Sequence, residues 1–424
     1  MRKSIFITAL LAMISFVIHA QSVDDALKQV GKSNDKAKEI IDKLAADPNN
    51  AKNADVWYVK AQIYNALATD DKFKTSVPDA YDQAFEAFKK SYDIDPNNKR
   101  MILDLYKTGF VAYEGVSNRA AAAYQANNLA AALEAYKKTI EYGDYLKSKN
   151  LSYSGYSVPK IDTGMVFMAG YTAMKLEKND EAMNYFSRIA EAKIGKEADY
   201  VIPYQFLSFQ YKAKKDEANF KKYVELGRQV YPHDPYFVTI KLDWARENNN
   251  YPELFSGYEE LIAMQPDSLT NALSYASELF DYLYIKNPDK RPADYDAIAA
   301  KIEANIKKTL AKDYDPLSSN LIIAQLYYNQ GLDQATESDK IKSTKPEDVK
   351  KKNDLKAKAM SRYELALPYT EKVATILETK GMANLNARER HTLKNMYIML
   401  GDMYTAKGDK VKAADYDKKY SSIK

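Results

Sequence analysis

Residues 204–266 read YQFLSFQYKAKKDEANFKKYVELGRQVYPHDPYFVTIKLDWARENNNYPELFSGYEELIAMQP, and their spacing decides the fold. Tyr204, Leu207 and Tyr211 recur at intervals of three and four residues, which places them on one face of a helix. Ser208 stands among them as a small residue. Because a small side chain leaves space, a second helix is expected to pack closely against this face.

The second helix and its closing turn recur after a fixed interval. Proline cannot continue a helix and disfavours helical backbone in the residue before it, so each proline here resets the direction of the chain. The step from Pro232 to Pro266 is 34 residues. A single helix pair cannot bury its own apolar face, but stacked neighbours bury it together. The matching apolar positions are Phe220, Val224 and Gly227 before Pro232, and Leu254, Tyr258 and Leu261 before Pro266.

Two helices of this combined length, closed by a proline turn, resemble the tetratricopeptide repeat (TPR) family. The resemblance implies an all-α, right-handed α-solenoid of TPR-like helix pairs, in which the first helix of each pair lines a concave groove. About seven pairs are expected, and Gly170 and Gly401 mark two of them. The repeat array is expected to span residues 21–424, with loops near 68–78, 143–159, 285–293 and 332–352.

The first residues have the pattern of a signal peptide. Arg2 and Lys3 precede an apolar run over residues 5–18, and the small Ala20 stands before the expected cleavage point. An uncleaved membrane anchor is the alternative, but this run is shorter than the roughly 20 residues that span a bilayer. We expect residues 1–20 to be a bacterial signal peptide and the protein to be exported to the periplasm or cell surface.

Composition narrows the function. The chain holds 62 Lys and Arg residues against 58 Asp and Glu residues, so it has no strong basic excess of the kind that nucleic-acid binders show. It has no Cys, and therefore neither disulfides nor an N-terminal lipidated Cys. No further apolar run is long enough to predict a transmembrane segment.

Catalytic and metal-binding motifs are not evident. Beyond the expected signal peptide the chain has only His233 and His391, which fall in distant repeats, so a Cys/His metal site or a Ser-His-Asp arrangement is not expected. No Gly-rich phosphate-binding loop occurs. The sequence therefore predicts no enzyme, no cofactor and no metal, although catalysis by carboxylates alone stays open.

Aromatic residues suggest a binding surface. Some of the 35 tyrosines occupy packing positions, and Tyr211 is expected to face its partner helix. Others project onto the groove, where aromatic rings give large contact area at a low cost in entropy. The alternative is that these rings only pack against neighbouring helices. The residues expected in the groove are Tyr58, Tyr124, Phe167, Tyr171, Phe209, Lys212, Tyr236 and Arg246.

These observations favour a non-catalytic scaffold or adaptor for protein–protein interaction in the bacterial envelope, holding a protein or peptide partner in the groove. The alternative is an envelope protein that binds a glycan or a peptide. The Lys and Asn clamp by which some TPR proteins hold chaperone C-termini is absent from the corresponding positions, so that function is disfavoured.

Overall fold

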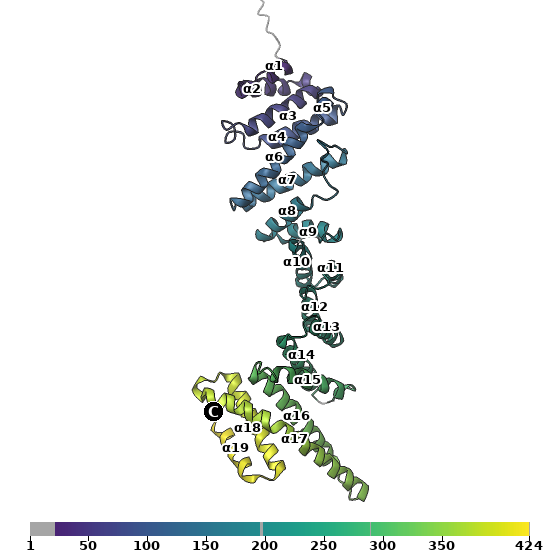
Figure 1. The fold of residues 1–424 in the computed structure, drawn as a ribbon, viewed down its shortest axis with the longest axis vertical. Helices are drawn as coiled ribbons and strands as arrows, with labels where there is room; N and C mark the ends of the chain where they lie inside the picture. The colour runs from purple at the N-terminus through teal and green to yellow at the C-terminus, as the bar shows by residue number, and fades with distance from the viewer. Residues whose placement is uncertain (1–21, 196–197, 289, 424) are drawn as a thin grey trace, which may run out of the picture. The chain divides into compact units, whose positions relative to one another are not determined.

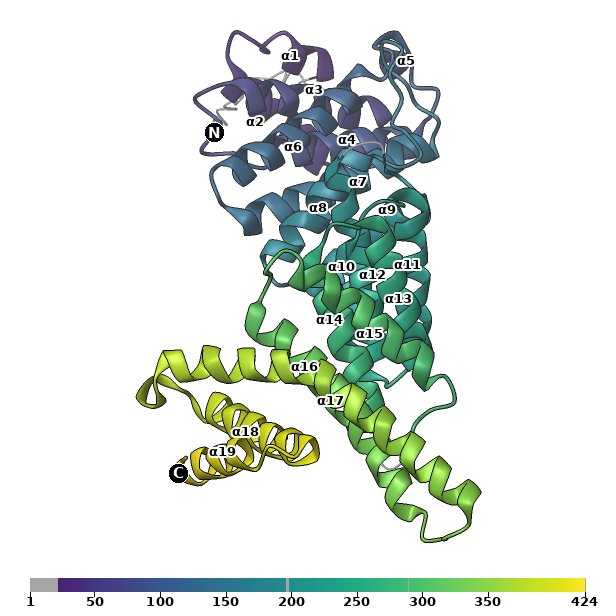
Figure 2. The same ribbon diagram turned by 60° about the horizontal axis from the view of Figure 1, so that its bottom comes forward.

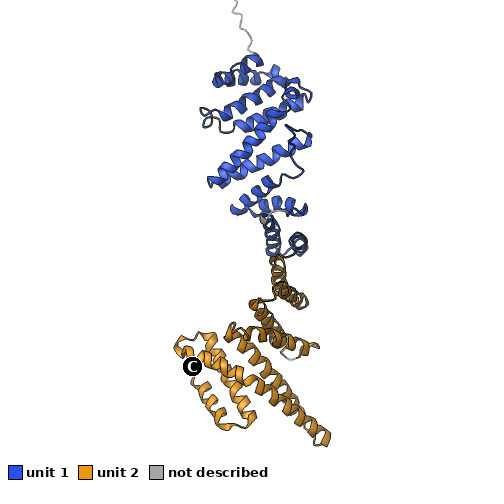
Figure 3. Cartoon of the chain, in the orientation of Figure 1, with its two compact units in different colours: residues 1–232 blue, residues 233–424 orange. Residues whose placement is uncertain are grey.

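A computed structural model of the protein describes residues 22–195, 198–288 and 290–423, so the expected signal peptide lies outside the described residues. The chain divides into two compact units, residues 1–232 and 233–424 (Figure 3). Helices account for most of the described residues of both units. The extended residues found there are Tyr153 and Tyr156, which form an isolated bridge. The all-α prediction is confirmed.

Unit 1 consists of consecutive antiparallel helices, which pair as α3/α4, α6/α7, α8/α9 and α10/α11 (Figure 1). Its elements are α1 (Val23–Leu27), α2 (Asn34–Ala46), η1 (Pro48–Asn50), α3 (Ala54–Thr69), α4 (Ala80–Ile94), α5 (Lys99–Leu103), α6 (Lys107–Gln125), α7 (Leu129–Ser148), α8 (Thr163–Lys175), α9 (Asn179–Glu191), η2 (Ala198–Tyr200), α10 (Val201–Ala213) and α11 (Glu217–Val230).

Unit 2 continues in the same way, with the pairs α12/α13, α14/α15, α16/α17 and α18/α19. The described residues of the two units thus contain eight pairs, one more than the approximate number predicted. The elements of unit 2 are α12 (Tyr236–Glu247), α13 (Tyr251–Met264), α14 (Leu269–Asp281), the π-helix η3 (Tyr282–Lys286), α15 (Tyr295–Leu310), α16 (Pro316–Lys340), α17 (Pro346–Lys380), η4 (Met382–Asn384), α18 (Ala387–Lys407) and α19 (Lys410–Ser422).

The turns inside several pairs share one local construction. Asn127, Lys215 and Asn249 have positive φ angles of 57°, 56° and 53°, which end the first helix in a left-handed residue. The next residue in each turn is Asn or Asp, and its side chain accepts a hydrogen bond from a free backbone N–H at the start of the second helix. These turns therefore follow from local sequence alone.

An ion-pair network joins three helices of unit 1. Asp82 of α4 is only 6% exposed, and Arg119 of α6 donates to both of its carboxylate oxygens, at 2.5 and 3.0 Å. Lys138 of α7 lies 3.2 Å from the same carboxylate. Burial by itself would raise the pKa of Asp82, but the hydrogen bond and charge of Arg119 outweigh it and hold the pKa below its ordinary value.

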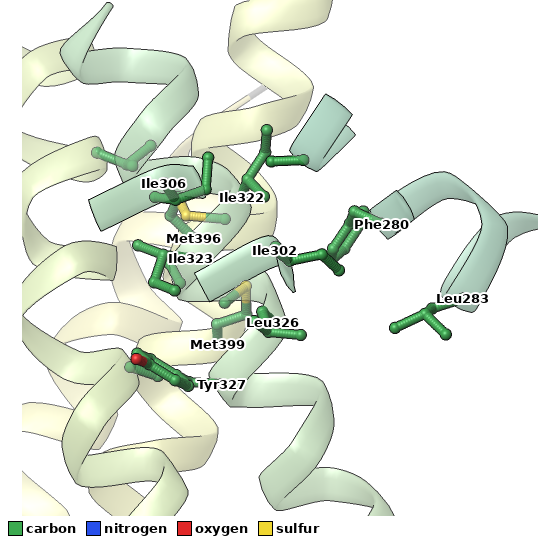
Figure 4. Close-up of a cluster of buried hydrophobic side chains, with 14 of the residues drawn as sticks. Phe280, Leu283, Ile302, Ile306, Ile322, Ile323, Leu326, Tyr327, Met396 and Met399 are labelled. Carbon is green, nitrogen blue, oxygen red and sulfur yellow. The ribbon is translucent and has the colours of Figure 1, made fainter. Parts of the chain in front are cut away.

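The core of unit 2 gathers apolar side chains from several pairs, including Phe280 at the end of α14 and Leu283 of η3. Both residues are buried, as is Tyr327 on α16. Figure 4 shows them with Ile302 and Ile306 of α15, Ile322, Ile323 and Leu326 of α16, and Met396 and Met399 of α18.

The prediction of a loop near residues 332–352 is wrong. Helix α16 continues to Lys340 and α17 begins at Pro346, so the two form a long hairpin with a turn at residues 341–345 (Figure 2). Lys and Glu are good helix formers, and the two arms also contact each other, since Ser338 Oγ donates to the Lys352 carbonyl at 3.2 Å. A projecting hairpin needs only a narrow apolar seam, so a largely charged sequence can form it when the two arms pack against each other.

The other expected loops are found with altered limits. Residues 70–79 connect α3 to α4, and the described residues 287–288 and 290–294 lie between η3 and α15, close to the predicted segments 68–78 and 285–293. The segment 143–159 is predicted too early, because α7 continues to Ser148. Gly143 is buried within that helix.

Candidate functional site

Two residues expected in the groove lie together on α8. Phe167 and Tyr171 are stacked, with ring centroids 5.8 Å apart and an angle of 13° between the ring planes. Tyr200 meets Phe167 edge-on at 5.2 Å, and Lys175 Nζ lies 5.2 Å from the centroid of Tyr171. Both Phe167 and Tyr171 are half-buried, so one part of each ring stays accessible.

Two aromatic residues of α10 lie on different faces of the helix, as their spacing predicts. Phe209 is 56% exposed, whereas Tyr211 stacks on Tyr223 of the second helix of the pair, with centroids 5.3 Å apart and planes 4° apart. Lys212 is half-buried on the same helix. Thus Tyr211 faces the partner helix, and Phe209 presents its ring away from it.

Tyr58 does not contribute to an open surface. Its side chain is 0% exposed, and its hydroxyl donates to Asp104 Oδ2 at 2.5 Å. Burial, followed by this hydrogen bond, raises the pKa of Tyr58 well above its ordinary value. The prediction failed because α5 and α6 contact α3 and cover this side of the helix. Tyr124, near the end of α6, is half-buried.

The last two predicted groove residues belong to unit 2. Arg246 donates from Nε to Glu278 Oε1 at 2.6 Å and from Nη2 to the Tyr258 hydroxyl at 3.0 Å. This guanidinium therefore already has partners within unit 2. Tyr236 meets Phe237 edge-on at 5.5 Å, and burial raises the pKa of Tyr236 to about 12.

A cavity in unit 1 lies outside the set of predicted groove residues. It has a volume of about 480 Å³ and lies between α6, the connection at residues 149–162 and the start of α8. Helices α6 and α8 are the first helices of their pairs, the side from which the predicted groove is built. The lining residues are Phe110, Tyr113, Glu114, Ser117, Tyr153, Ser154, Tyr156, Asp162 and Met165.

A tight turn holds two aromatic rings over this cavity. Tyr153 and Tyr156 exchange two backbone hydrogen bonds of 2.9 Å, and the intervening Ser154 and Gly155 have φ angles of 54° and 82°. The ring centroid of Phe110 lies 6.2 Å from that of Tyr153 and 6.1 Å from that of Tyr156, which it meets at 82°. The three rings therefore form walls that differ in orientation.

Asp162 fixes the floor of the cavity. Its Oδ2 accepts a hydrogen bond from the Tyr113 hydroxyl at 2.5 Å, and its Oδ1 accepts one from the Met165 backbone N–H at 3.3 Å, which caps α8. Burial and the Asp162 carboxylate together raise the pKa of Tyr113 well above its ordinary value. Tyr113 therefore stays protonated and keeps donating this hydrogen bond.

Part of the signal for this cavity is present in the sequence. The tyrosine-rich connection has no helical periodicity, which predicts a loop, and it contains Tyr153, Gly155 and Tyr156. Nothing in the local pattern indicates that this connection folds back onto Phe110 of α6, which lies more than one helix earlier in the chain.

A second cavity of about 490 Å³ lies over α3 and α4. Its main aromatic residue is Trp57, and Lys90 Nζ lies only 3.4 Å from the centroid of that ring. Lys60 and Lys89 also line the cavity. A cation of the protein itself already covers the Trp57 ring. This cavity therefore leaves less aromatic surface accessible to a ligand than the cavity under residues 149–162 does.

The chain was compared with known proteins. No family model matches it, and no curated protein matches it either. Solved structures similar to this chain include the human IFIT1 dimer with m7Gppp-AAAA, at 13% identity and a TM-score of 0.24 over 94% of this chain and 99% of that one. Yeast Tom70 is similar at 13% identity and a TM-score of 0.23 over 92% of this chain and 93% of that one.

A third similar structure is Naa15/Naa10 bound to HypK-THB, at 12% identity and a TM-score of 0.27, with 95% of this chain and 58% of that one covered. At such identities and TM-scores these likenesses carry no argument about what this chain binds. Among the described residues, no helix combines the length and apolar character needed to cross a membrane.

Proposed function

We propose that this protein is a non-catalytic scaffold of the bacterial envelope, which holds a protein partner against the first helices of the pairs in unit 1. The observation that carries the proposal is the accessible aromatic surface on two successive first helices. Phe209 on α10 is 56% exposed, and Phe167 and Tyr171 form a half-buried stack on α8. A large ring that is left exposed on a helix whose Tyr204 and Leu207 are buried suits an interface anchor.

Export to the envelope is the second part of the proposal, and it rests on the signal-peptide pattern of residues 1–20. It predicts that the protein recovered from the envelope begins at Gln21. Intact-mass measurement of that protein tests this, and a mass that includes residues 1–20 contradicts it.

Partner binding is tested by crosslinking in the envelope fraction, identification of the crosslinked protein, and measurement of its affinity for purified variants. Phe209→Ala should weaken binding by about 1–3 kcal/mol, which is the range for an interface anchor. Far-UV circular dichroism should be unchanged, because the ring packs little in the folded chain.

Tyr420→Ala is the matched control, since Tyr420 is another exposed aromatic residue, at 40%, but lies in unit 2. Binding of the identified partner should be unaffected by this change. If Phe209→Ala also leaves the affinity unchanged, the first helices of unit 1 are not the binding surface.

A further inference from the structure

The cavity between α6 and residues 149–162 has a distinctive chemical lining. Four of its nine lining residues are aromatic, and the two charged ones are both acidic, Glu114 and Asp162. No Lys or Arg is among these nine residues. The lining thus has a formal charge of −2, and it also contains aromatic rings whose faces carry partial negative charge.

The two carboxylates differ in how they are held. Asp162 is fixed by the hydrogen bonds from Tyr113 and from the start of α8. Glu114 lies exposed on α6, and no ion pair joins it to another of the described residues. One carboxylate is therefore part of the wall, and the other is left available to a ligand.

Elsewhere in this protein, lysine side chains lie over the faces of aromatic rings. Lys90 Nζ lies 3.4 Å from the Trp57 centroid and Lys175 Nζ lies 5.2 Å from the Tyr171 centroid, both within the distance at which a cation is drawn to a ring face. At those two places the cation comes from the chain. The lining of the cavity under Tyr153 and Tyr156 supplies rings and acids without such a cation.

We propose that this cavity is a binding site for an organic cation, an alkylammonium group that lies against the cluster of Phe110, Tyr153 and Tyr156 and pairs with Glu114. Phe110 and Tyr156 pack edge-on against each other, at 82°, and so form one continuous aromatic wall for the cation. The volume of about 480 Å³ lies within the range of small-ligand sites. Anionic ligands are disfavoured, because both carboxylates would repel them.

This site does not depend on the protein partner proposed above. The alkylammonium group has two sources, a free small cation or the side chain of a Lys residue in a peptide. Both present the same chemistry to the cavity, so the probes include one of each.

The free-cation probe is choline, and its control is 3,3-dimethylbutan-1-ol, which has the same shape without the charge. The peptide probe is Gly-Lys-Gly, and its control carries an acetylated Lys. Isothermal titration calorimetry on the mature chain should detect binding of choline or of the Lys peptide, with neither neutral control binding comparably. Choline alone identifies a free cation as the ligand, and the peptide alone identifies a partner's side chain.

Two variants locate the binding. Tyr156→Ala should weaken binding of the cation about 5- to 30-fold, the effect of losing one partly desolvated cation–π contact. Tyr156 is 48% exposed, so the change leaves the fold intact. Glu114→Gln keeps the shape of the side chain and should weaken binding by a similar factor, and more so at low salt.

Glu141→Gln on the exposed face of α7 and Phe209→Ala on α10 are the controls, and both should bind the cation as the unchanged protein does. Loss of partner binding in Phe209→Ala with intact choline or peptide binding separates this site from the proposed scaffold surface. The proposal is overturned if neither cation binds, if the neutral isostere binds as tightly as choline, or if Tyr156→Ala and Glu114→Gln leave affinity unchanged. Tyr156-dependent binding of a neutral saccharide in place of the cations overturns it as well.

Discussion

Gly170 and Gly401 should respond in opposite ways to the same substitution by alanine. Both lie in the first helix of a pair, α8 and α18, and both are buried there. A Cβ atom on Gly170 would lie 2.7 Å from Cδ1 and Cε1 of Phe186, whose ring is 0% exposed. A Cβ atom on Gly401 would meet only Asp417 Oδ1 at 3.2 Å, the far end of an exposed and flexible side chain.

The magnitudes follow from two opposing effects. Alanine in place of glycine within a helix stabilises by roughly 1 kcal/mol. Overpacking of a tight core costs about 1–3 kcal/mol, and Phe186 cannot easily yield because Phe206 packs edge-on against it at 5.4 Å. Gly170→Ala should therefore destabilise unit 1 by about 1 kcal/mol. Gly401→Ala should stabilise unit 2 by about 0.5–1 kcal/mol.

Hydrogen exchange read by mass spectrometry measures the two units separately. Peptides from α8 and α9 should exchange faster in Gly170→Ala, and peptides from α18 and α19 should exchange more slowly in Gly401→Ala. Each variant serves as the control for the unit that the other changes. If both variants stabilise their unit, or if both destabilise it, the reasoning is refuted, because the contacts of the added Cβ would then not decide the change in stability.

Three further results are expected. Asp82→Asn should make the protein less stable, and this loss should be fully present above about pH 4, the ordinary Asp pKa. The loss should shrink as pH falls through the lower pKa of folded Asp82. Urea titrations from pH 2 to 7 measure the difference in stability, and a difference that stays constant over this range contradicts the prediction. Limited trypsin digestion should cut early after Lys342 in the hairpin turn, whereas equally early cuts at Lys350 and Lys351 would show that α17 begins later. Tyr58→Phe leaves Asp104 without its phenolic donor and should destabilise unit 1 by about 1–3 kcal/mol in urea unfolding, while Tyr124→Phe, at a half-buried ring, should change stability little.

The sequence alone was enough for most of the helices and for the turns inside several pairs. Helical hydrogen bonds join residues four apart, and capping residues such as Asn128 and Asp216 act within one turn, so local spacing carries this information. The opposite directions of Phe209 and Tyr211 follow in the same way, because a two-residue step on a helix turns a side chain toward another face.

Tertiary structure decided which of these faces stay open. Tyr58 and Phe209 both stand on the first helix of a pair, yet α5 and α6 cover Tyr58 while Phe209 is 56% exposed. The charged arms of the α16/α17 hairpin and the fold-back of Tyr156 onto Phe110 likewise depend on contacts between distant residues. Spacing along a helix fixes the direction of a side chain, but burial depends on which distant elements pack there, and a local pattern does not encode that.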